Sequence, residues 1–83
     1  MLTLQFYTRQ ECTLCESALV VVRRVQQRVP FQLECIDIDA DPALRARYGT
    51  VIPVVTCGSI ELACSFIEEK SLSAALKNLA KKV

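Results

Sequence analysis

Two cysteines three positions apart offer the clearest chemistry in the chain. Cys12 and Cys15 lie in the stretch YTRQECTLCESAL, between a run that alternates like a strand and a run with helical spacing. Two thiols at this spacing can form a reversible disulfide, supply half of a metal site, or be ordinary small residues of a core. A location where a strand ends and a helix begins favours the reversible disulfide.

The position of the pair on a helix would give its two thiols different roles. Cys12 at the helix N-terminus would face unpaired backbone N–H groups and the positive end of the helix dipole, which stabilise a thiolate. Cys15, almost one turn later, would lie deeper but within disulfide reach. Cys12 would then attack a disulfide and Cys15 would resolve the product. Arg9 would favour the thiolate, and Glu16, on the same helical face as Cys12, would oppose it.

Metal binding is the main chemical alternative. A structural zinc site needs four ligands, and the chain has no histidine. Cys35, Cys57 and Cys64 form no second pair at metal spacing and are expected as core or strand residues, with Cys64 nearest to the active-site end of the sheet. A zinc or iron–sulfur carrier would therefore need thiols from outside the chain.

The chain around the cysteine pair predicts elements in the order β-α-β-α-β-β-α. Apolar residues alternate in the expected strands and recur at three- and four-residue spacing in the expected helices. The strands are expected over residues 2–7, 31–39, 51–57 and 60–64, and the helices over residues 13–28, 42–48 and 72–79. Strands one and two should be parallel with a right-handed crossover, and the last two should form a hairpin. The fold class is α/β, with a mixed four-stranded sheet flanked by helices.

Local signals set the expected helix ends. Asp41 suits the N-cap of the short middle helix and Gly49 a left-handed turn at its end. Ser71 suits the N-cap of the last helix, and Pro30 stops the first one. The apolar face of the first helix is expected to begin at Leu14.

The composition limits the function classes. The chain has 83 residues, of which 52% are hydrophobic and 23% charged, and its net charge is +1, so we expect a single globular domain over residues 1–83. The scattered basic residues argue against nucleic acid, and no apolar run approaches the roughly 20 residues that span a bilayer. Without a signal-like N-terminus, and with an odd count of five cysteines, we expect a cytoplasmic monomer rather than a disulfide-framework protein.

Two longer motifs carry a resemblance to a known family. The stretches FYTRQECTLCESA and DIDADPALRARYGTVIPV are similar to the corresponding stretches of thioredoxin-fold, glutaredoxin-like proteins. Within these, the chain resembles the small uncharacterised glutaredoxin-like branch that has a C-x-x-C motif. The resemblance extends over nearly the whole chain and implies a thioredoxin-like fold.

The resemblance implies roles for four residues. Cys12 would be the nucleophile, Cys15 the resolving thiol, and Pro53 a cis-proline beside the dithiol. The backbone of Ile52 would pair with an extended substrate or with the γ-glutamyl part of glutathione. The plain alternative for Pro53 is a trans proline at the start of an edge strand.

The match is looser for glutathione binding. Arg9 falls where glutaredoxins place a lysine that meets a glutathione carboxylate, and a guanidinium can bind a carboxylate bidentately. Ser65 and Phe66 replace the acidic pair that caps the other end of glutathione, and Phe66 is expected in the core. Thr13 and Leu14 replace the usual aromatic or proline between the cysteines.

The predicted function is that of a thiol–disulfide oxidoreductase that reduces protein or glutathione mixed disulfides through Cys12 and Cys15. It would hold no bound cofactor, use glutathione at most as a co-substrate, and depend on an external reductant. Two alternatives remain open. One is a metal or iron–sulfur carrier that binds through the C-x-x-C motif, and the other is a redox-inert module that binds a partner in its cis-proline groove.

Overall fold

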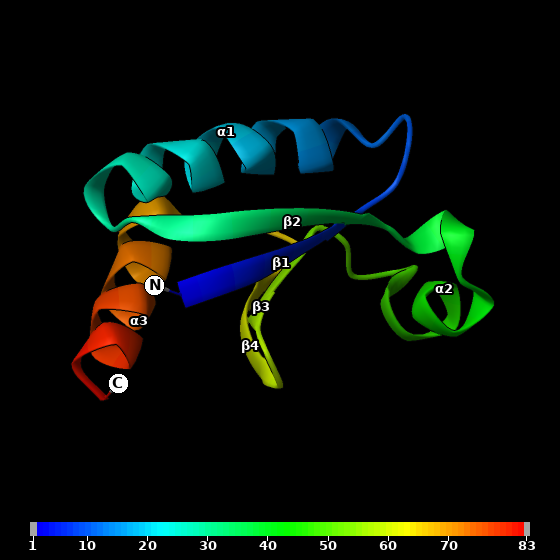
Figure 1. The fold of residues 1–83 in the computed structure, drawn as a ribbon. Coiled ribbons are helices and arrows are strands. Elements are labelled where there is room, and N and C mark those ends of the chain that lie inside the picture. Colours follow the sequence, from blue (N-terminus) through cyan, green and yellow to red (C-terminus); the bar gives the residue numbers. More distant parts are fainter. Residues whose placement is uncertain (1, 83) are drawn as a thin grey trace.

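A computed structural model describes residues 2–82 and has the expected order of elements (Figure 1). A short 3₁₀ helix, η1, follows the second strand and is the one addition to that order. The strands are β1 (Leu2–Thr8), β2 (Phe31–Asp37), β3 (Val54–Cys57) and β4 (Ile60–Cys64), and the helices are α1 (Thr13–Arg28), η1 (Ile38–Ala40), α2 (Pro42–Tyr48) and α3 (Glu69–Lys82).

The four strands form one mixed sheet in the order β2-β1-β3-β4. β1 runs parallel to β2 and antiparallel to β3, and β3 pairs with β4 as a hairpin. Phe6, on the central strand β1, lies opposite Cys35 on one side and Val55 on the other. The parallel first pair, the hairpin and the mixed sheet are therefore confirmed.

Alternating residues of the central strands divide the core between the two faces of the sheet. Phe6 and Val55 belong to the larger cluster, on the face that α1 and α3 cover, whereas Val54 and Tyr48 belong to a smaller cluster at α2. The Tyr7 ring lies 4.5 Å from the Tyr48 ring, centroid to centroid. The larger cluster includes buried residues of α1, of α3 and of the loop before α3: Cys15, Ala18, Val22, Val25, Ile67, Leu72 and Leu76.

Helix α1 begins and ends where the sequence predicts, but its first turn differs from the expectation. Cys12 is the N-cap and Arg28 the last helical residue, shortly before Pro30. The buried stripe starts at Cys15, whereas Leu14 is 60% exposed. The expectation that Leu14 opens the buried face was therefore wrong, because the buried stripe passes through Cys15 and Ala18 and Leu14 lies at its edge.

Two cap predictions were also wrong. Gly49 has a right-handed φ of −55°, and a Cβ there would stand 2.5 Å from the carbonyl oxygen of Arg45, so a close approach rather than a left-handed turn favours glycine. Ser71 lies inside α3, which begins at Glu69; its hydroxyl donates to the Glu68 carboxylate at 3.2 Å. The Asp41 cap of α2 is confirmed, since its carboxylate accepts from the Ala43 N–H at 2.9 Å.

Two strands are shorter than predicted. β2 ends at Asp37, whose carboxylate accepts from the Asp39 N–H and so starts η1. β3 begins at Val54, after a cis peptide bond between Ile52 and Pro53. Proline has no N–H to donate to a neighbouring strand, so strand pairing starts at Val54, the residue after Pro53.

Candidate active site

Cys12 and Cys15 are brought together at the N-terminus of α1. Their sulfurs lie within disulfide-bonding distance and their Cα atoms are 5.2 Å apart. The backbone N–H of Cys15 donates a hydrogen bond to the Cys12 Sγ at 3.2 Å. Cys12 therefore occupies the capping position of the helix with its sulfur as the acceptor.

The two cysteines differ in exposure. Cys12 is half-buried, whereas Cys15 is 3% exposed and belongs to the main core. A capping sulfur satisfies one of the unpaired N–H groups of the first turn and lies at the positive end of the helix dipole. This geometry suits a pair in which a substrate meets Cys12 first and Cys15 follows from inside.

A cavity of about 210 Å³ adjoins the pair and has a third cysteine in its wall. Arg9, Glu16 and Cys35 line it together with Cys12 and Cys15. Cys35 is exposed. Cys35 lies in a strand, as predicted, but its place at this site was not predicted. The strand register could have done so, because Cys35 lies opposite Phe6 on β1, two residues before the end of that strand.

Arg9 lies at the site, but its charge already has a partner. Its Nη2 and Nε atoms donate to the two carboxylate oxygens of Asp39 at 2.9 and 3.2 Å. A bidentate pair of this kind uses the fork of the guanidinium that would otherwise bind a substrate carboxylate. Arg9 is thus near the cysteines, as expected, but is held by a residue 30 positions away.

The Ile52–Pro53 segment is fixed by hydrogen bonds on both sides. The N–H of Ile52 donates to the carbonyl of Tyr48 at 3.1 Å. The carbonyls of Val51 and Pro53 both accept from the N–H of Ser65, at 2.9 and 2.8 Å. Ser65 therefore ties the loop that follows β4 to the cis-proline loop.

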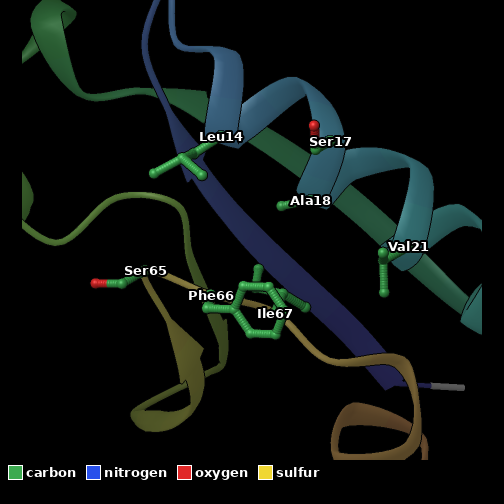
Figure 2. A pocket seen from close by; sticks show the side chains of 7 residues that line it. All are labelled: Leu14, Ser17, Ala18, Val21, Ser65, Phe66 and Ile67. Atoms are coloured by element: carbon green, nitrogen blue, oxygen red, sulfur yellow. The ribbon is translucent and has the colours of Figure 1, made fainter.

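Phe66 lies on the surface, and its expected place in the core was wrong. It is 77% exposed, because the chain turns sharply at Ser65, whose φ is +61°, and the next residue, Ile67, fills the core position instead. Phe66 faces α1 across an apolar groove (Figure 2). No pattern in the sequence predicted this groove.

The remaining cysteines form no further cluster with the pair. Cys57 is half-buried, and Cys64 is exposed at the end of β4, opposite Val54. Since Val54 directly follows Pro53, Cys64 lies at the active-site end of the sheet. Within residues 2–82, no group of three or more cysteine, aspartate or glutamate residues is arranged to hold a metal ion. No helix in this part of the chain has the length and apolar character needed to cross a membrane.

Solved structures define the class of the fold. The chain is similar to a protein from X. campestris, target XcR50, with a TM-score of 0.78, 25% identity, and coverage of 90% of this chain and 96% of that one. It is also similar to protein Ne2328 from Nitrosomonas europaea, with a TM-score of 0.78, 30% identity and 89% coverage of both chains. A thioredoxin from Fasciola hepatica shares the fold at 21% identity and a TM-score of 0.64, over 93% of this chain and 79% of that one. The fold is thioredoxin-like.

The family is defined by sequence as well. Residues 3–77 match the model described as "Glutaredoxin-like domain (DUF836)", and the chain belongs to this family. No functionally curated protein matches the chain. A thioredoxin-like fold of this family with a cysteine pair at disulfide distance points to redox chemistry of thiols.

Proposed function

We propose that the protein is a thiol–disulfide oxidoreductase in which Cys12 is the nucleophile and Cys15 the resolving thiol. The observation that carries this proposal is the hydrogen bond from the Cys15 N–H to the Cys12 Sγ at the start of α1. A donor aimed at a sulfur stabilises the thiolate over the thiol, and the thiolate is the attacking species. The burial of Cys15 behind it supports the order of the two steps.

The reaction is a two-electron exchange. The Cys12 thiolate attacks one sulfur of a substrate disulfide, a Cys12–substrate disulfide forms, and the other substrate sulfur leaves as a thiolate. The Cys15 thiolate then attacks the Cys12 sulfur, which releases the second substrate thiolate and leaves Cys12 and Cys15 as a disulfide. The substrate is reduced by two electrons, and its thiolates take up protons from water. An external dithiol, or two monothiols such as glutathione, returns the electrons by the reverse exchange.

Substrates are protein disulfides or glutathione mixed disulfides. The bond between Ile52 and Pro53 is cis, and this segment would position the substrate beside Cys12, whereas Arg9 could join it only after leaving Asp39. The enzyme would work in the cytoplasm, where disulfides are usually transient and catalytic, as a monomer with no bound cofactor.

Equilibration of the purified protein in graded glutathione redox buffers tests this function. Free thiols are trapped by alkylation, and each cysteine is followed by intact mass and peptide mapping. We expect the Cys12–Cys15 disulfide, or a glutathione adduct confined to Cys12, to form before any oxidation of Cys35, Cys57 or Cys64. Oxidation of those three cysteines ahead of the pair would reject the function.

A further inference from the structure

An apolar groove runs along α1 from Leu14, the residue before Cys15. Its walls are Leu14, Ala18 and Val21 from α1 and Phe66 and Ile67 from the loop after β4, and its volume is about 140 Å³ (Figure 2). Leu14 lies between Cys12 and Cys15 in the chain, so this end of the groove is near the dithiol, although neither cysteine lines it. From Leu14 to Val21 the helix rises about 10 Å, which is the length of about three residues of an extended peptide.

The groove offers nothing to a charged ligand. None of the described residues that line it is charged. In Figure 2 the hydroxyl groups of Ser17 and Ser65, at its rim, point away from it. The Ser65 hydroxyl lies 3.3 Å from the Val51 carbonyl and its N–H is shared by two carbonyls, while the Phe66 N–H donates to the Cys64 carbonyl at 2.7 Å. The Ser65 hydroxyl and the N–H groups of Ser65 and Phe66 are therefore already used inside the protein.

The nearest cation on the other side of the dithiol is also occupied. Arg9 forms its bidentate pair with Asp39. Glutathione carries two carboxylates and an ammonium group, and burying these groups without partners costs free energy. An apolar side chain faces no such cost in the groove, and it would cover Leu14 and Phe66, which are 60% and 77% exposed.

We propose that this groove binds an apolar side chain next to the reacting cysteine of a peptide or protein disulfide, and that it selects such substrates over glutathione disulfide. This inference rests on the proposed function, because it concerns the substrate whose sulfur Cys12 attacks. Leu14 and Phe66 form the two sides of the specificity site. A leucine one or two residues from the substrate cysteine reaches the groove while its sulfur is at Cys12.

A matched pair of peptides tests the selection. The probes are the symmetric disulfides of two blocked five-residue peptides, Gly-Leu-Cys-Leu-Gly and Gly-Ser-Cys-Ser-Gly, together with glutathione disulfide and hydroxyethyl disulfide. Reduced protein is mixed with each probe, the reaction is stopped with acid, and the released thiol gives a second-order rate constant. Each rate constant is divided by the rate constant with which dithiothreitol reduces the same probe. The quotient no longer depends on the intrinsic reactivity of that probe.

We expect the leucine peptide to react at least about tenfold faster than the serine peptide and than glutathione disulfide, which corresponds to partial burial of a leucine side chain. In Phe66→Ser the leucine-to-serine ratio should fall to about three or less. The ratio is independent of the fraction of folded protein. The control Val20→Ser also removes an apolar side chain from the surface of α1 (52% exposed), and it should keep the wild-type ratio.

Four outcomes would overturn the inference alone, without the proposed function. The first is a leucine-to-serine ratio near one in the wild type, with normal reaction of hydroxyethyl disulfide, which would leave the oxidoreductase function intact. The second is glutathione disulfide reacting as fast as the leucine peptide, and the third is an equal loss of the ratio in Val20→Ser. The fourth is a dimer in sedimentation that Phe66→Ser dissociates, which would assign the groove to a second copy. If no probe reacts at all, including hydroxyethyl disulfide, the proposed function fails and the inference with it.

Discussion

The Arg9 guanidinium donates two hydrogen bonds to the Asp39 carboxylate, at 2.9 and 3.2 Å, across 30 residues of sequence. The two side chains are 39% and 36% exposed, so the pair is in contact with solvent and contributes at most about 1 kcal/mol to stability. Its larger consequence is chemical. The Asp39 carboxylate neutralises Arg9, the cation nearest to the cysteines in the chain, and occupies the two N–H donors with which Arg9 could bind a substrate carboxylate.

Asp39→Asn should therefore raise the rate of exchange with glutathione disulfide. A freed guanidinium can meet a glutathione carboxylate, and an exposed pair of this kind corresponds to an increase of about twofold to fivefold. The second-order rate constant at low salt measures it, and added salt should reduce the gain. Glu61→Gln, which removes an exposed negative charge from β4, is the matched control. If the rate constant rises equally in both variants, the change in net charge explains the gain and the release of Arg9 does not.

The difference in burial between the two cysteines leads to a trapping experiment. In Cys15→Ser the resolving thiol is gone, so a Cys12–peptide disulfide should accumulate in stoichiometric amount after reaction with the leucine peptide disulfide. Cys12→Ser should form no such adduct, since Cys15 is 3% exposed. Intact mass followed by peptide mapping identifies the modified cysteine, and Cys57→Ser should behave as the wild type. An adduct on Cys35 in the Cys15→Ser protein would show that the third thiol of the cavity is the reactive one.

The packing of α1 on the sheet can be tested by the same substitution at two neighbouring valines. Val22 is 0% exposed and Val20 is 52% exposed. Val22→Ala removes two methyl groups from the core and should lower the free energy of unfolding by about 2 kcal/mol, including the cavity. Val20→Ala should change it by less than about 0.5 kcal/mol, because alanine also has the higher helix propensity. Urea denaturation measures both values, and equal losses would mean that the helix face is assigned wrongly.

The sequence predicted those parts of the fold that depend on local patterns. The alternation around Leu4 and Phe6 and the helical spacing up to Val25 reflect which face of one element is buried, and the structure has both. The Asp41 cap is a hydrogen bond within one turn, and it is present as well. Cys12 at the helix start likewise followed from the local pattern. The cis bond before Pro53 was implied only by the family resemblance, since the local pattern alone favoured a trans proline.

Predictions from the sequence were wrong or missing where a contact joins segments that are distant in the chain. Leu14 continues the apolar spacing of α1, but whether it is covered depends on where the sheet ends beneath the helix. Phe66 is apolar, yet the turn at Ser65 gives the core position to Ile67. Asp39 meets Arg9 only because the parallel strands β1 and β2 end side by side. No periodicity within one element contains such information.

The two glycines of the chain differ in why a side chain is unfavourable, and asparagine distinguishes them. Gly58 has a φ of +64° and open space where a Cβ would stand, and asparagine tolerates this conformation better than most residues. Gly58→Asn should therefore lower the free energy of unfolding by at most about 1 kcal/mol.

Gly49→Asn meets the opposite situation. The backbone conformation there is ordinary, with a φ of −55°, but a Cβ would press on the backbone carbonyl of Arg45. Relief requires the end of α2 to move, and crowding of this kind costs about 1–3 kcal/mol. Because the next residues lead directly to Ile52 and Pro53, the shift should also slow exchange with the leucine peptide disulfide. Urea denaturation and that rate constant check the prediction, and a Gly49 variant as stable as the Gly58 variant would refute it.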